Sequence, residues 1–316
     1  MTTPLQFYRL FRDLLREQGV RALLTSGMAC VEYGIQETTK DTDWIIHPDD
    51  FEKLVSLLCR QEKGLSGANW RISYRGIFGA PLDREYHLGG WTSHLIIQDV
   101  PSSEEQRLDF FGQPPRLTAE KAFAVSGDEL ADELVVAQMK KTDRDKDWPM
   151  VEALCDLVGS RKNAEALLHA RSPDLLKALW TTASEDQRKT LMKRRPLLVE
   201  MDTPRFGLRK CLAAERTLWE EVNKGRYRRF QHEWKQFIRR WRGQNDFAWP
   251  VSASFDRQHD LVCGAVRQHE LPLEPLGGAE GRMKIVENAQ SVIVEIYGDD
   301  VGLLETITPP LEEMLP

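Results

Sequence analysis

Residues 24–29 read LTSGMA and residues 38–43 read TTKDTD, and these two short stretches carry most of what the sequence says about the fold. The second stretch opens an expected strand and places Asp41 and Asp43 at alternate positions. Because side chains alternate along a strand, both carboxylates project from the same face and need a cation to offset their repulsion. Magnesium suits such a pair, since it binds one or two carboxylates together with substrate phosphates.

A third acid joins this pair. Asp109 lies within the apolar run RLDFF at residues 107–111, another expected strand, where a charged carboxylate is costly unless a metal or a donor compensates it. The sequence therefore predicts Asp41, Asp43 and Asp109 as ligands of two magnesium ions about 3.5 to 4 Å apart, with Asp109 also activating an attacking hydroxyl. Upstream, Ser26 and Gly27 stand between a strand and a short helix, where a backbone without a bulky side chain can approach phosphate oxygens.

In this order the residues resemble the nucleotidyltransferase superfamily that includes the palm of the DNA polymerase beta type. That family is marked by a Gly-Gly or Gly-Ser loop, a short spacer, an Asp-x-Asp strand and a distant Asp on a neighbouring strand. The counterparts here are Ser26-Gly27, a spacer of 13 residues, Asp41 with Asp43, and Asp109. Serine replaces the first loop glycine, and Thr42 stands between the acids where an apolar residue is usual.

More narrowly, residues 26–46 look like the bacterial abortive-infection and toxin-type branch, in which a glycine pair and an alanine precede a Thr-x-Asp-x-Asp strand. The segment Gln138-Met139-Lys140, followed by DRDKD at 143–147, is similar to a helix of that branch. The resemblance covers about residues 20–160. It implies that Lys140 helps to bind the triphosphate and offsets charge on the leaving group.

The resemblance also implies an activity. A nucleoside monophosphate would pass from a nucleoside triphosphate to a hydroxyl of a tRNA or other RNA, of a protein, or of a small molecule, with two Mg²⁺ ions as cofactors. A toxin-type protein would also have an antitoxin protein as partner. The alternative, from another class, is a non-catalytic module that keeps the fold and binds RNA or a protein partner.

The expected fold class is α+β, with a nucleotidyltransferase-like mixed sheet and flanking helices, then a helical domain, then a small mixed α/β module. Hydrophobic periodicity predicts helices over 5–19 and from residue 48 onward, and strands over 20–24, 41–46, 70–74, 92–98 and 107–111. The predicted domains are 1–118 (catalytic), 119–249 (helical) and 250–316 (the small module, with a hairpin of strands 283–286 and 291–297).

Plainer interpretations stay open for each acid. Asp41 and Asp43 also fit a solvated turn before a strand, and Asp109 fits a structural ion pair with Arg107 or Arg116. The alternating acids of residues 143–147 fail the calcium-loop pattern and predict a charged helical face.

Residues 205–242 carry 12 Lys or Arg against four Glu, interleaved with aromatic residues. Four of the rings fall on one stripe of a helix and are expected to be core (Phe230, Trp234, Phe237 and Trp241). Arg228, Arg239 and Arg242 project elsewhere and are candidates for an RNA-facing surface.

The composition of the 316-residue chain excludes several classes. Its net charge of −6 argues against wholesale electrostatic capture of nucleic acid, and its five widely spaced cysteines fit neither a disulfide framework nor a zinc knuckle. No apolar run reaches the length of a membrane span, and the first residues are amphipathic and charged, unlike a signal peptide. The sequence therefore predicts a cytoplasmic protein without a membrane partner.

Overall fold

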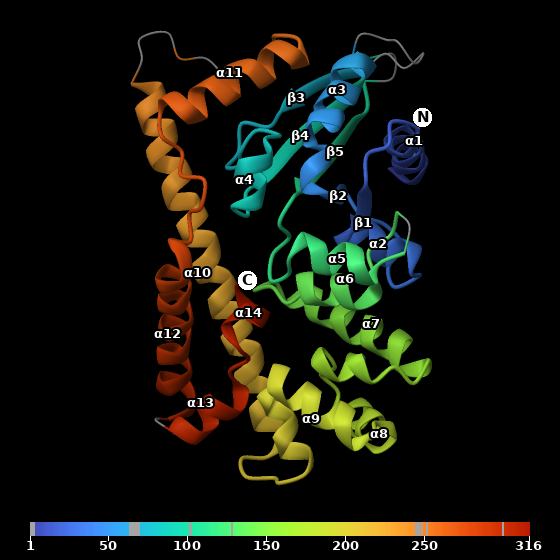
Figure 1. Ribbon diagram of the computed structural model, residues 1–316, viewed down its shortest axis with the longest axis vertical. Coiled ribbons are helices and arrows are strands. Elements are labelled where there is room, and N and C mark those ends of the chain that lie inside the picture. The colour runs from blue at the N-terminus through green and yellow to red at the C-terminus, as the bar shows by residue number, and fades with distance from the viewer. Residues whose placement is uncertain are drawn as a thin grey trace. The chain divides into compact units, whose positions relative to one another are not determined.

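A computed structural model shows one five-stranded sheet accompanied by many helices, which confirms the predicted α+β class (Figure 1). No helix in the described part of the chain is long and apolar enough to cross a membrane. The residues that the structure describes are 4–62, 70–100, 103–127, 129–243, 247, 249–250, 252–298 and 300–316.

The chain divides into two compact units, each assembled from separated stretches. Unit 1 comprises Met1–Pro114, Ala119–Ala131 and Arg229–Pro275, and unit 2 comprises Pro115–Thr118, Asp132–Arg228 and Leu276–Pro316. These units are defined by compactness, and the three consecutive domains expected from the sequence remain a prediction.

The sheet lies in unit 1 and has the strand order β1-β2-β5-β4-β3. The central pair β2 and β5 is parallel, and the other neighbouring strands are antiparallel, so the predicted mixed sheet is confirmed. The strands are β1 (Ala22–Thr25), β2 (Asp41–Ile46), β3 (Trp70–Tyr74), β4 (Thr92–Asp99) and β5 (Glu105–Phe111).

Alternation along the strands gives the sheet one apolar face. On β2 and β5, the buried side chains of Trp44 and Phe110 alternate with the half-buried Asp43 and Asp109. Helix α1 (Pro4–Glu17) covers the apolar face, because the ring of Phe11 lies 5.8 Å from that of Trp44 and 6.1 Å from that of Phe110.

Helix α3 (Phe51–Glu62) begins after the 3-10 turn Pro48–Asp50 and packs on α1 and β3 with Leu54, Leu57 and Leu58 buried. The fixed φ of Pro48 and the acids of the first turns favour a helix start here, as predicted. The other helices wholly within unit 1 are α2 (Ser26–Glu32), α4 (Arg84–Leu88), α5 (Ala119–Val125) and α11 (Phe255–Gln268).

The long helix α10 (Leu208–Arg242) contributes its last turns to unit 1. Phe230, Trp234 and Phe237 are buried there and Trp241 is half-buried, which confirms the predicted core stripe. Phe230 packs edge-on against Trp91 with the ring centroids 5.0 Å apart.

Unit 2 is helical throughout its described residues. Its helices are α6 (Glu133–Met139), α7 (Trp148–Ser160), α8 (Pro173–Thr182), α9 (Glu185–Arg194), the first part of α10, α12 (Gly278–Tyr297), α13 (Val301–Ile307) and α14 (Leu311–Met314), with 3-10 turns at Asp145–Asp147, Ala164–Leu168 and Pro196–Met201.

The predicted hairpin in the C-terminal module is wrong. Residues 283–286 and 291–297 belong to the single helix α12, and the described residues of 250–316 form only helices, so the module is not mixed α/β. The β-branched residues suggested strands, but tertiary packing determines the secondary structure here. Ile285, Ala289 and Ile293 recur at helical spacing and are buried. Gly225 of α10 makes room for this helix, since a Cβ there would lie 2.8 Å from Cγ2 of Ile285.

Candidate active site

The register of the sheet brings the three predicted acids to one face. Asp43 on β2 and Asp109 on β5 are direct partners in the parallel pair, and Asp41 stands two residues before Asp43 on the same face. The partner of Asp41 on β5 is Arg107. Two acids side by side on adjacent strands, with a third one step along, are the arrangement that the sequence predicts for a metal site.

Asp109 is held by basic neighbours that the sequence did not identify. Nδ1 of His94 lies 2.7 Å from Oδ1 of Asp109, and Nη1 of Arg75 lies 3.7 Å from the same oxygen. The proposed pairing with Arg116 is wrong, because this guanidinium is buried in unit 2 and donates to the carbonyl oxygens of Gln138 and Met139.

Asp41 has one basic neighbour at longer range, since Nη1 of Arg107 lies 3.9 Å from Oδ1 of Asp41. This separation exceeds that of a hydrogen bond. Oδ1 of Asp41 is itself a buried atom, and it finds no hydrogen-bond partner in the part of the chain that the structure describes. The Asp41 carboxylate therefore has a buried oxygen that makes no hydrogen bond among the described residues and lies near the guanidinium of Arg107.

Ser26 and Gly27 lie next to the acids. They follow Thr25, the last residue of β1, and Thr25 is the direct partner of Asp43 across the sheet. Ser26 has a φ of +54°, in the left-handed region that non-glycine residues seldom occupy, so the chain turns sharply here. Gly27 is confined by Thr39, since a Cβ at Gly27 would lie 2.6 Å from Oγ1 of Thr39.

This turn is also tied to the loop that leads into β2. Nε2 of Gln36 donates a hydrogen bond of 2.6 Å to the carbonyl oxygen of Gly27. The Ser26-Gly27 turn and the start of the Asp41–Ile46 strand are thus fixed to one another, and only glycine fits at position 27 without moving Thr39.

Lys140 lies in unit 2, where it is 5% exposed, and its Nζ lies 3.4 Å from Oδ1 of Asp147. Asp147 also accepts from Arg144 and Thr142. Burial raises the pKa of Asp147, but the charge of Lys140 and the bonds from Thr142 and Arg144 outweigh it and lower that pKa overall. The triphosphate role of Lys140 stays a prediction.

The expected charged helical face at residues 143–147 is therefore wrong for Asp147. The segment contains a short 3-10 turn, Asp145–Asp147, and Asp147 is fully buried. Asp143 and Asp145 do face outward, where they accept from Asn223 and Arg216.

The donor set on the sheet fits magnesium. Three carboxylates supply hard oxygen ligands, and one of them has a buried oxygen without a hydrogen-bond partner among the described residues. In their present positions, no three His, Cys, Asp or Glu side chains of the described residues are gathered closely enough to form a metal cluster. Two Mg²⁺ ions at Asp41, Asp43 and Asp109 thus stay a prediction.

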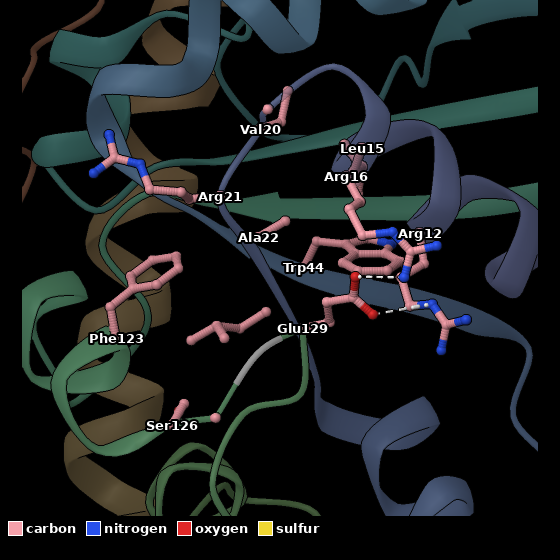
Figure 2. Close-up of a pocket in the computed structure, with 13 residues that line it drawn as sticks. Arg12, Leu15, Arg16, Val20, Arg21, Ala22, Trp44, Phe123, Ser126 and Glu129 are labelled. Atoms are coloured by element: carbon pink, nitrogen blue, oxygen red, sulfur yellow. Dashed lines mark hydrogen bonds and ion pairs between the residues drawn. The ribbon is translucent and has the colours of Figure 1, made fainter.

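A cavity in unit 1 lies away from the three acids. It measures about 690 Å³ and lies between α1, β1 and the segment after α5 (Figure 2). Trp44 lines it, and because Trp44 follows Asp43 along β2, the cavity lies on the opposite face of the sheet from the acids. Figure 2 shows Glu129 turned toward Arg12 and Arg16. Its carboxylate lies 3.3 Å from Nε of Arg12 and 3.2 Å from Nη1 of Arg16, so it offsets part of their positive charge.

His94 and Arg75 are the residues of this site that the sequence analysis missed. The alternation of β4 places His94 on the polar face, and this can be inferred from the sequence. Its position opposite Asp109 depends on the pairing of β4 with β5, which no local pattern specifies.

In comparisons with known proteins, the chain matches no family model and no curated protein. Membership of the nucleotidyltransferase superfamily therefore stays a prediction from the sequence motifs.

Proposed function

We propose that this chain is a metal-dependent nucleotidyltransferase of the polymerase-beta type, which transfers a nucleoside monophosphate from a nucleoside triphosphate to a hydroxyl group. The observation that carries the proposal is the register of the sheet, which sets Asp43 beside Asp109 and keeps Asp41 on the same face. Such a concentration of like charge is unfavourable unless positive groups offset it, and a bound divalent cation would add to the partial compensation by Arg75 and Arg107.

The acids would hold two Mg²⁺ ions, which supply charge stabilisation at the phosphates when bound. Asp109 would position the acceptor hydroxyl and take its proton as the oxygen attacks the α-phosphorus. The bond from that phosphorus to the bridging oxygen then breaks, and pyrophosphate leaves. Ser26 and Gly27, next to Asp43 through Thr25, would contact the β- and γ-phosphates. Positioning and electrostatics supply most of the rate in such a reaction.

The acceptor is proposed only by class: a tRNA or other RNA, a protein or a small molecule. A toxin-type role, with an antitoxin protein that neutralises the enzyme, belongs to the same proposal. Growth arrest on expression, abolished by Asp41→Ala, tests that role, since equal arrest by the variant would show that transfer is not its cause.

The activity is tested by incubating the protein with Mg²⁺, cellular RNA and cellular protein, using each triphosphate labelled at either the α- or the γ-phosphorus. Nucleotidyl transfer puts the α-label, and never the γ-label, into one macromolecular fraction. A γ-label in the product would indicate phosphoryl transfer. No label in RNA or protein would exclude these two acceptor classes, and no release of γ-labelled pyrophosphate after addition of a small-molecule cell extract would contradict the proposal.

A second candidate is a non-catalytic module that binds RNA, and it is favoured by the outer face of α10. His232, Lys235, Arg239 and Arg242 recur at helical spacing and are all exposed, on the side away from Trp234 and Phe237. Basic side chains in a row along a helix suit a phosphate backbone. RNA binding without label transfer would favour this candidate.

A further inference from the structure

We propose that His94 is a positioning residue, which orients the carboxylate of Asp109 so that one of its oxygens faces the divalent cation. This inference rests on the proposed function, because it assigns a role relative to the metal site. It adds to the three acids a fourth residue, which neither the motif nor the family resemblance identifies.

The sheet itself places His94. On β4 it is the direct partner of Asp109 in the antiparallel pair with β5, while Asp43 is the partner of Asp109 on the other side. The three residues therefore form a row across three adjacent strands on one face. Nδ1 of His94 lies 2.7 Å from Oδ1 of Asp109, a normal length for a strong hydrogen bond.

The imidazole is held in place by its surroundings. Its side chain is 11% exposed, and the ring of Phe78 lies 5.9 Å away. Gly79 passes so close that a Cβ there would lie 2.9 Å from Cδ2 of His94 and 2.7 Å from the carbonyl oxygen of Thr92. A ring confined in this way gives the carboxylate a fixed partner, which is what an orienting residue requires.

The proposed metal site gives the hydrogen bond a direction. A carboxylate that binds a cation is ionised and only accepts, so in this site Nδ1 of His94 carries the hydrogen and donates the hydrogen bond to Oδ1 of Asp109. Arg75 approaches the same oxygen at 3.7 Å, so both contacts fall on Oδ1. We assign the other oxygen, Oδ2, to the cation. Donors that hold one carboxylate oxygen are the usual support for a ligand whose other oxygen binds metal.

The experiment measures Mn²⁺ binding to the full chain by electron paramagnetic resonance, with no nucleotide turnover. His94→Leu removes the donor and should weaken Mn²⁺ binding about 10- to 100-fold. His94→Asn places an amide donor near the position of Nδ1 and should restore binding to within about threefold of the parent protein. Parent-like binding by His94→Leu, or an equal loss in His94→Asn, would overturn the inference.

A matched control separates orientation from general loss of stability. His87 is also a buried histidine of unit 1, and it contacts Ser93, the residue before His94 on the other face of β4, at 2.8 Å. His87→Asn should lower the melting temperature and leave Mn²⁺ affinity unchanged. If His87→Asn weakens binding as much as His94→Leu does, the effect is structural and the inference fails.

Gly79→Ala provides a second route if His94→Leu does not fold. The added methyl group displaces the ring without removing it, and should weaken Mn²⁺ binding by less than His94→Leu but measurably, about threefold or more. Unchanged binding by Gly79→Ala would count against the inference.

Asp43→Asn keeps the inference distinct from the proposed function. If Asp43→Asn abolishes Mn²⁺ binding and His94→Leu does not alter it, only the role of His94 fails. If the parent protein binds no Mn²⁺, both proposals fail.

Discussion

Two groups of charged side chains, one in each unit, are built in opposite ways. In unit 2, Glu215 is 2% exposed and accepts from Arg195 at 2.8 Å and 2.6 Å and from Arg171 at 2.6 Å. Arg195 also donates to the carbonyl oxygens of Leu167 and Ala170. Burial raises the pKa of Glu215, but the charges and bonds of the two arginines outweigh it and lower that pKa overall.

The acids of unit 1 lie in a more open arrangement. Asp41 is 44% exposed on its side chain and Asp109 is 17% exposed, and their arginine neighbours stand 3.9 Å and 3.7 Å away. The contact from His94 to Asp109 is short, at 2.7 Å. One oxygen of Asp41 is buried without a hydrogen-bond partner in the described residues.

The difference separates a buried ion pair that stabilises the fold from a carboxylate that has an unsatisfied oxygen. A buried ion pair is tolerable only when hydrogen bonds satisfy it, and Glu215 meets that condition. Oδ1 of Asp41 has no hydrogen-bond partner among the described residues, and a group left partly unsatisfied is a candidate for ligand binding. Substitutions in the two groups should therefore affect different properties.

The largest effect is expected at the acids. Asp43→Asn should lower nucleotidyl transfer about ten-thousandfold, because the carboxylate beside Asp109 would no longer hold a cation. The free energy of unfolding should change by less than about 1 kcal/mol, since one of three repelling charges is removed. Label transfer and urea unfolding measure the two properties. Asp49→Asn, in an exposed pair with Arg84, is the control and should leave both unchanged.

Glu215→Gln should instead lower the stability of the fold strongly. Removing one partner of a buried, fully bonded pair costs about 3 to 5 kcal/mol, measured as the free energy of unfolding in urea. The control is Glu185→Gln, whose carboxylate is 80% exposed and lies 2.6 Å from Lys189, and which should cost less than about 1 kcal/mol. Equal losses of unfolding free energy in the two variants would show that the buried contacts of Glu215 stabilise the fold no more than a surface ion pair does.

Lys141, in the same unit as Glu215, should make the stability of the fold depend on pH. Burial lowers the pKa of Lys141 to about 7, although Glu215 opposes this. The unfolded chain has the ordinary value of about 10.4, so between pH 7 and that value it binds a proton that the folded chain does not, and stability rises with pH. The parent protein should gain a few kcal/mol across this window relative to Lys141→Met. Parallel pH profiles would show that Lys141 stays charged in the fold.

The smallest effect is expected on the exposed face of α10, where the basic side chains are exposed to solvent. Lys235→Gln combined with Arg239→Gln should weaken binding of single-stranded RNA about tenfold and reduce the slope of log affinity against log salt by about 1.4. Fluorescence anisotropy measures both quantities. The control pair Lys177→Gln and Lys210→Gln, also exposed, should alter neither, and an equal loss there would show that only net charge matters.

The sequence predicted the sheet well because strands β3, β4 and β5 alternate between buried and more exposed side chains over much of their length. The strands at residues 41–46 and 70–74 were predicted with the bounds that the structure has. Pro48 and the regularly spaced leucines after it predicted the helix that follows residue 48. The same reasoning failed at α12, where Ile285, Val286 and Ile293 suit a strand locally and are fixed as a helix by packing against α10.

The candidate site was predictable to the extent that it is local. Asp41 and Asp43 share a face by alternation alone, and Asp109 was predicted as a third ligand because a charged residue is costly within the apolar run of residues 107–111. His94 could not be found, because its role depends on which strands pair and in what register. The burial of Lys140 against Asp147 likewise depends on tertiary structure.

The most direct measurement of the central claim is a crystal structure of the chain soaked with Mn²⁺ and a non-hydrolysable nucleoside triphosphate. We expect anomalous density for two ions bound by Asp41, Asp43 and Asp109, with the triphosphate extending toward Ser26 and Gly27. A triphosphate bound elsewhere, or no anomalous density at these carboxylates with Mn²⁺ present in excess, would contradict the account.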